Sequence, residues 1–463
     1  MQQMLIVLGI LLVFGCADVS KENQLQTGCS EGSESTPANE YVSPSPTPSP
    51  TVTSWTKQLG TSSSDSGYGI TSDSSGNIYV TGFTDGDLDG NTSAGSDDIF
   101  VVKYNSSGIK QWTQQLRTSS NDTGVGITSD SSDNVYITGF TRGDLDGNTN
   151  AGSNDLLDGY ELNDLFVVKY NSSGIKQWTR QLGTSSSDSG NGITSDSRGN
   201  VYVSGTTEGG LDGNTNAGSS DIFVVKYNSS GVKQWTRQLG TSSSDTGYGI
   251  TSDSSDNVYI TGSTVGGLNG TTNAGSSDLI VVKYNSSGVK QWTRQLGTSS
   301  SDSGYGITSD SRGNVYVSGT TEGGLDGNTN AGLNDLIVVK YSSSGIKQWT
   351  RQLGTSSGDR GWRITSDSSG NVYVTGDTWG GLDGNTSAGS DDIFVVKYNS
   401  SGIKQWTQQL GTAEHDEGHD ITIDSSGNLY ATGYIGYGLD GNTYAGGRSD
   451  IFVVKYDTNG NKQ

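Results

Sequence analysis

Side chains suited to binding or catalysis gather in two short stretches near the C-terminus. The first, "GTSSGDRGWRI" (354–364), departs from the commoner "GTSSSDSGYGI" (297–307) by gaining two arginines and a tryptophan. The second, "GTAEHDEGHDI" (411–421), contains the only two histidines of the chain. Together with the aromatic residues that follow these stretches, the candidate ligand-binding residues are Arg360, Trp362, Arg363, Trp379, His415, Glu417, His419, Tyr434, Tyr437 and Tyr444.

Aromatic rings beside charged side chains offer flat apolar area and orienting hydrogen bonds, which a sugar- or peptide-binding surface requires. The pattern therefore predicts a ligand-binding patch. A narrower hypothesis is a transition-metal site for Zn²⁺, held by His415 and His419 with a neighbouring carboxylate. Alternation along a strand places residues 415, 417 and 419 on one side, which makes that geometry possible. Atypical terminal repeats and drift after duplication are the competing explanations.

A second group of side chains has the chemistry of a calcium ligand set. "DGDLDGN" (85–91) places Asp85, Asp87 and Asp89 at alternate positions before a glycine, and carboxylate oxygens are the ligands that Ca²⁺ prefers. Later copies of this segment, such as "EGGLDGN" and "VGGLNGT", lose most of these donors. The alternative is a polar loop without a metal.

All these residues belong to one long internal repeat. Tryptophans at 55, 112, 178, 235, 292, 349 and 406 are 57 residues apart, except for one interval of 66 that contains the insertion "LLDGYELND" (156–164). Each copy has four strand signals, rich in β-branched and aromatic residues and separated by Asn, Ser and Gly turns. No segment has a helical apolar period.

The strands are displaced by one position relative to the repeat. Seven triplets of strands A, B and C follow one another, but the first strand D (53–60) precedes them all, and the last triplet is followed only by "DTNGNKQ". Pairing the leading strand with the final triplet would complete seven four-stranded sheets in a closed ring. We therefore expect an all-β, seven-bladed β-propeller closed by the N-terminal strand, which leaves no ragged sheet edge.

The repeat resembles the SBBP family of bacterial seven-bladed propeller repeats. The resemblance rests on "ITSDSSGNVYVTG", "DIFVVKY", the "NSSG" turn and the following Trp, and it covers residues 53–463. It implies the propeller fold and often an exported or cell-surface protein. It implies no particular reaction, because fold alone does not determine function.

In such a propeller, the A–B and C–D turns lie on one face, and the long B–C and D–A loops lie on the other. A binding site is expected on the long-loop face, since loops vary without disturbing strands. The repeated Trp and the loop Leu (Leu88 in the first copy) are interpreted as packing residues. The Asp of "TSDSSGN" is interpreted as a turn-capping residue.

The N-terminus has the features of an export signal. Residues 5–15, "LIVLGILLVFG", form an apolar run that is too short to span a membrane. "VFGC" resembles the lipobox of bacterial lipoproteins, which predicts lipidation at Cys16 and a cell-envelope location, at the outer membrane or cell surface. The expected domains are a signal peptide (1–15), a Pro/Ser-rich tether (16–52) that contains Cys29, and the propeller (53–463).

The composition limits the partners. A formal net charge of −22 argues against nucleic acid and anionic membrane surfaces. The favoured function is a monomeric, non-enzymatic binding or adhesion scaffold for protein or carbohydrate ligands, attached to the membrane only through a lipid. The alternatives are a metal-assisted hydrolase or lyase that uses the cluster in repeats six and seven, and a structural spacer of the envelope. No nucleophile in the sequence has a recognisable base partner.

Overall fold

The computed structural model describes residues 55–152 and 162–463, all within the compact unit Val52–Gln463. The expected signal peptide, the lipidation at Cys16, the tether with Cys29 and most of the insertion (156–161) lie outside the described residues. In the part that is described, no helix combines the length and apolar composition needed to cross a membrane.

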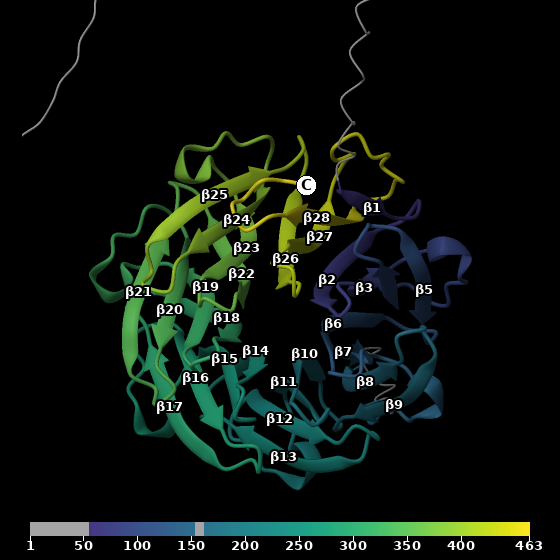
Figure 1. Ribbon diagram of the computed structural model, residues 1–463. Helices are drawn as coiled ribbons and strands as arrows, with labels where there is room; N and C mark the ends of the chain where they lie inside the picture. The colour runs from purple at the N-terminus through teal and green to yellow at the C-terminus, as the bar shows by residue number, and fades with distance from the viewer. Residues whose placement is uncertain (1–54, 153–161) are drawn as a thin grey trace, which may run out of the picture. The chain divides into compact units, whose positions relative to one another are not determined.

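The described chain forms seven four-stranded antiparallel sheets around a centre, which confirms the predicted propeller (Figure 1). Blade one contains β2 (Asp65–Ser72), β3 (Ile78–Thr84), β4 (Asp98–Tyr104) and β5 (Lys110–Leu116). Blade two contains β6 (Asp122–Ser129), β7 (Val135–Thr141), β8 (Asp164–Tyr170) and β9 (Lys176–Leu182). Blade three contains β10 (Asp188–Ser195), β11 (Val201–Thr207), β12 (Asp221–Tyr227) and β13 (Lys233–Leu239).

The remaining blades follow the same order from the centre outward. Blade four contains β14 (Asp245–Ser252), β15 (Val258–Thr264), β16 (Asp278–Tyr284) and β17 (Lys290–Leu296). Blade five contains β18 (Asp302–Ser309), β19 (Val315–Thr321), β20 (Asp335–Tyr341) and β21 (Lys347–Leu353). Blade six contains β22 (Asp359–Ser366), β23 (Val372–Thr378), β24 (Asp392–Tyr398) and β25 (Lys404–Leu410). Blade seven contains β26 (Asp416–Ile423), β27 (Leu429–Ile435), β28 (Asp450–Tyr456) and β1 (Lys57–Leu59).

The two ends of the chain complete blade seven together. Strand β1 pairs with β28, as predicted, and Figure 1 shows the two side by side. The outer strand of this blade contains residues from both chain ends, which was not expected. Lys462 pairs with Tyr456, and the Trp55 amide donates to the Gln463 carbonyl at 2.6 Å. Lys462 and Gln463 therefore occupy the first positions of the outer strand, and Trp55 to Leu59 continue it.

The tight turns follow from side chains that bond their own backbone. In the first A–B turn, Asp73 accepts hydrogen bonds from the amides of Ser75 and Asn77 at 3.0 and 2.8 Å, and from the Tyr79 hydroxyl at 2.9 Å. This satisfies backbone donors that the turn would otherwise leave unpaired. The predicted turn-capping role of this Asp is confirmed.

The core consists of seven separate layers between adjacent blades. Strand β7 shows how alternation builds two of them: Val135 and Ile137 pack toward blade one, whereas Tyr136 packs toward blade three. The two middle strands of a blade thus bury both faces, as in β7 and β8, and they read as nearly continuous runs of apolar and β-branched residues. The fold needs no single large core, because each blade packs only on its neighbours.

The repeated tryptophans join neighbouring blades. The ring of Trp112 lies 5.9 Å from that of Tyr79 in its own blade and 6.5 Å from that of Tyr170 in the next. Gly174, at φ +78°, lies under this ring, and a Cβ there would come within 2.9 Å of it. The predicted packing role of the tryptophans is confirmed.

The loop leucines have the same kind of role, and all seven are buried: Leu88, Leu145, Leu211, Leu268, Leu325, Leu382 and Leu439. Six of them begin short 3₁₀ turns: η1 (Leu88–Gly90), η2 (Leu145–Gly147), η3 (Leu211–Gly213), η4 (Leu268–Gly270), η5 (Leu325–Gly327) and η6 (Leu382–Gly384).

Candidate ligand-binding site at the channel mouth

The innermost strand of every blade carries a β-bulge facing the central channel. In β2 the register skips one residue between Gly67 and Gly69, which leaves the residue at position 68 without a partner on β3. A bulge of this kind re-aims a side chain and often lies beside a functional site. The seven bulged residues are Tyr68, Val125, Asn191, Tyr248, Tyr305, Trp362 and His419.

Five of these bulged residues form a continuous arc of rings. Centroids lie 5.0 Å apart for Tyr248 and Tyr305, 4.7 Å for Tyr305 and Trp362, 6.4 Å for Trp362 and His419, and 4.8 Å for His419 and Tyr68. Because each inner strand starts at the D–A loop, its fourth residue lies in the long-loop half of the channel. The arc therefore borders the channel mouth on the face where a site was expected.

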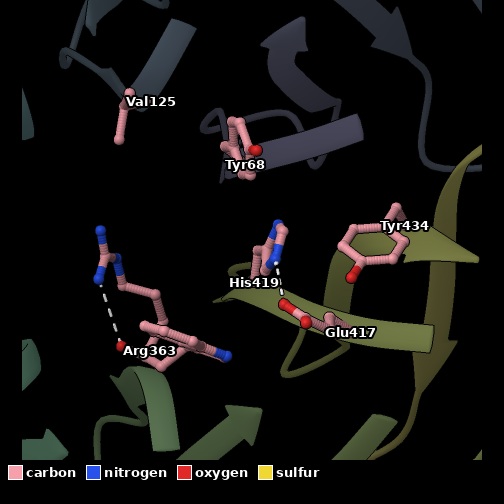
Figure 2. Close-up of a pocket in the computed structure, with 7 residues that line it drawn as sticks. Tyr68, Val125, Arg363, Glu417, His419 and Tyr434 are labelled. Carbon is pink, nitrogen blue, oxygen red and sulfur yellow. Dashed lines mark hydrogen bonds and ion pairs between the residues drawn. The ribbon is translucent and has the colours of Figure 1, made fainter. Parts of the chain in front are cut away.

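A pocket of about 370 Å³ opens within this arc, lined by residues of blades one, two, six and seven. Figure 2 shows Arg363 on one side of it and the Glu417–His419 pair with Tyr434 on another. The residues that line it are Tyr68, Val125, Trp362, Arg363, Glu417, His419 and Tyr434.

Glu417 and His419 form a tightly connected pair. Glu417 Oε2 lies 3.1 Å from His419 Nε2, and His419 Nδ1 lies 3.1 Å from the Gly67 carbonyl oxygen. Both ring nitrogens thus face acceptors, and only the doubly protonated ring can donate both hydrogen bonds. Burial tends to raise the pKa of Glu417, but hydrogen bonds from His419 and Tyr434 and the charges of His419 and Arg360 lower it.

A second buried carboxyl group lies behind the arc. Trp362 Nε1 donates to Asp377 at 2.6 Å, and the Arg360 guanidinium lies 4.0 Å from the other oxygen of Asp377. Arg360 also lies over the rings of Trp362 and Trp379, at 5.9 and 5.3 Å. Burial and the charge of Glu417 raise the pKa of Asp377 to about 7, although Arg360 and Trp362 oppose this. This group therefore changes charge near neutral pH.

Arg363 lies deeper in the channel, between two cavities. It lines the mouth pocket and also an inner cavity of about 140 Å³ that is bordered by Asp420 and isoleucines such as Ile70. At its position five other blades have glycine, and Gly306 has no room for a Cβ, which would lie 2.7 Å from the Arg363 Cα. Glycine at this position therefore allows the inner strands of blades five and six to approach closely.

Six of the predicted ligand-binding residues meet around this pocket: Arg360, Trp362, Arg363, Glu417, His419 and Tyr434. Trp379 is connected to them through Arg360 and is 46% exposed. The remaining three do not line it. Tyr437 and Tyr444 stack on each other at 5.9 Å in the last B–C loop, and His415 contacts Asp391 of the neighbouring blade.

The structure does not bring His415 and His419 together. Glu417 and His419 contact each other, whereas the His415 side chain contacts Asp391 and is 70% exposed. Across residues 55–152 and 162–463, no group of three or more His, Cys, Asp or Glu side chains is arranged to hold a metal ion.

The three aspartates of the calcium hypothesis are likewise not gathered into one site. Asp87 accepts the Ser93 amide at 2.6 Å, whereas Asp89 takes a left-handed conformation and binds Lys110 and Thr113 of β5. Asp85 is exposed. Equivalent Asp–Lys contacts recur in other blades, for example between Asp146 and Lys176, which explains the repeated Asp as a structural residue.

Sequence reasoning missed Tyr68, Val125 and Asp377. Tyr68 was overlooked because tyrosine is the commonest residue at its position, and only ring closure brings blade one beside blade seven. A usable signal existed, because position 68 and its equivalents differ between copies while the flanking residues hardly change.

Seven segments match the β-propeller repeat of the SBBP family: residues 54–89, 111–146, 177–212, 234–269, 291–326, 348–383 and 405–436. An uncharacterized WD repeat-containing protein of Acanthamoeba polyphaga mimivirus is 24% identical over 88% of this chain and 34% of its own length. The regulatory protein FlaEY of Caulobacter vibrioides is 28% identical over 34% of this chain and 18% of its own. The alignments thus span about a third or less of these relatives.

Among solved structures, the WD40 domain of Pan2 from Neurospora crassa is similar over 84% of this chain and 88% of that domain, with 9% identity and a TM-score of 0.44. The family match is more specific, because it recurs once in each of the seven repeats. The chain belongs to the SBBP family of β-propeller repeat proteins.

Proposed function

We propose that this protein is a non-enzymatic binding scaffold that holds part of a protein or glycan ligand in the pocket at the long-loop mouth of its channel. The observation that carries this proposal is the arc of bulged rings, which presents Tyr68 and Trp362 beside the fixed Glu417–His419 pair. Apolar surface with a few oriented polar groups is the usual composition of a small-ligand site.

The hydrogen bonds of the pocket favour binding over catalysis. A general base needs a ring nitrogen that is free to accept a proton from a nucleophile. Both nitrogens of His419 are already directed at acceptors, and Glu417 is held by His419 and Tyr434. The pair is therefore better suited to orienting a ligand than to moving a proton.

The relatives are compatible with an interaction role, since one is named as a WD repeat-containing protein and another as a regulatory protein. The apolar run that ends at Cys16 supports display of the scaffold from the cell envelope. A structural spacer without a ligand remains the competing function, and the experiment below decides between them.

The test is to probe glycan and matrix-protein arrays with the purified full chain and three variants. Tyr68→Ala and Trp362→Ala should lose the signal of any ligand, because both rings line the pocket. Tyr248→Ala is the matched control: it removes the same residue type from the same bulged position in blade four, outside the pocket lining. Blank arrays, or equal loss in all three variants, would contradict the proposal.

A further inference from the structure

The floor of the mouth pocket holds a cation whose direct partners are all neutral. Arg363 donates to the carbonyl oxygens of Tyr305 at 2.9 Å, Trp362 at 3.3 Å and Asn191 at 3.4 Å. These carbonyls fix the guanidinium in place, and no carboxylate of residues 55–152 or 162–463 forms an ion pair with it.

Asp420 is the carboxylate that acts on this charge, yet it is committed elsewhere. Its two oxygens accept the amides of Ile70 and Ile421, both at 2.8 Å. Burial raises the pKa of Asp420 to about 6, against the opposing charge of Arg363, so its negative charge is also lost as the pH falls through that value. Asp420 therefore acts on the charge of Arg363 without forming an ion pair with it.

The carboxylate that lines the mouth pocket, Glu417, has partners of its own. Glu417 Oε2 lies 3.1 Å from His419 Nε2, and Glu417 also has a hydrogen bond from Tyr434 and the charge of Arg360 nearby. Among the residues that line the pocket, Arg363 is thus the cation without a carboxylate in direct contact, in a protein whose formal net charge is −22.

A buried cation is costly unless an anion pairs with it, and a guanidinium pairs best with a planar, bidentate acceptor. We propose that Arg363 receives the carboxylate of the ligand, while a flat or apolar portion next to that carboxylate lies against Tyr68 and Trp362. This inference rests on the proposed function and defines its ligand class. A doubly charged phosphate is less suitable, because Glu417 and Asp420 would repel it more strongly.

Benzoate tests this proposal, with benzyl alcohol and benzylamine as neutral and cationic probes of similar size and phenyl phosphate as the dianion. Titration calorimetry of the full chain should show benzoate binding at least about tenfold more tightly than each of the other three. A wild-type chain that binds benzyl alcohol as well as benzoate, or that prefers benzylamine or phenyl phosphate, would overturn the carboxylate inference without any variant being needed.

Variants locate the effect. In Arg363→Gln, the affinity for benzoate should fall to within about twofold of the affinity for benzyl alcohol. Arg363→Lys should retain part of the preference, because lysine keeps the positive charge but lacks the paired N–H donors that bind both carboxylate oxygens. Arg312→Gln, which removes an exposed charge from an A–B turn on the opposite face, should leave the preference unchanged. A preference that survives Arg363→Gln in a folded protein would contradict the assignment.

Two further titrations distinguish a protein ligand from a carbohydrate ligand as the source of the carboxylate. Peptides with a free or an amidated C-terminus test a protein ligand, and glucuronate against glucose tests an acidic sugar. If all four aromatic probes bind with equal affinity and Trp362→Ala abolishes the binding of each, the proposed pocket function stands and the carboxylate inference fails. If no probe binds at concentrations up to about 10 mM, weaker than a typical small-ligand site, and the arrays are blank, both fail.

Discussion

The junctions between blades and the mouth of the channel are built from the same repeat, but they differ in how closely the seven copies agree. At the junctions, Tyr79 and its equivalents are fully buried tyrosines in all seven blades. At the mouth, the bulged position holds Tyr, Val, Asn, Trp or His. A packed interface tolerates little change in volume, whereas a bulged residue lies outside the sheet ladder and can vary. The difference indicates where a repeat protein can acquire a specific site without losing its ring.

The largest expected effect concerns the repeated scaffold. Removing residues 1–60 deletes β1 and exposes the edge of β28 and one face of the blade-seven packing around Trp55. We expect the cooperative thermal transition to fall by more than about 10 °C or to disappear, because several kcal/mol of apolar burial is lost.

The control is removal of residues 1–51, which leaves the compact unit Val52–Gln463 intact and should not change the melting temperature. Calorimetry of both truncations checks this. Equal melting temperatures for the two would mean that β1 does not close the ring.

An intermediate effect is expected on the pH dependence of stability, which is caused by buried aspartates. Burial raises the pKa of Asp377 to about 7 and the pKa values of Asp122, Asp188 and Asp416 to about 6. The folded state therefore favours the protonated carboxyls, and this stabilisation is present below about pH 4 and lost as the pH rises through 6 to 7. The melting temperature should be several degrees higher at pH 5 than at pH 8.

Asp377→Asn tests whether Asp377 causes the loss of stability near pH 7. The neutral amide can still accept the Trp362 hydrogen bond, so the variant should be more stable than the wild type at pH 8, by about 1–3 kcal/mol. The difference should be smaller at pH 5 and should vanish only below about pH 4. Urea unfolding at both pH values measures this. A variant that is less stable than the wild type at pH 8 would show that the Arg360–Asp377 contact outweighs the cost of the buried charge.

The smallest effect separates the two histidines. His415→Ala removes an exposed ring that contacts Asp391 outside the pocket, so the melting temperature should change by less than about 2 °C and benzoate affinity should stay within twofold. His419→Ala removes one hydrogen-bond partner of Glu417, so the carboxylate should repel benzoate more strongly and benzoate affinity should fall by at least about tenfold. Parallel titrations check both. Similar affinity losses would place the site on the outer loops instead.

Much of the fold could be predicted from the residues. The spacing of the tryptophans, the alternation of turn and strand signals and the displaced first strand were sufficient for the seven-bladed ring and its closure. The candidate site was predicted in part: the five candidates within 360–363 and 417–419, together with Tyr434, line or border one pocket. His415, Tyr437 and Tyr444 were included because they are near in sequence, but they lie on the outer loops.

The sequence by itself determined the number of blades, the strand order and the packing residues, because these depend on local turn chemistry and on a pattern that recurs at a constant spacing. Only the tertiary structure decided which exceptions act together. Ring closure places Tyr68 against His419, whose positions are 351 residues apart along the chain, and one bulged residue per inner strand turns side chains toward the channel. Such contacts are set by the geometry of the whole ring, so no segment of the sequence carries them.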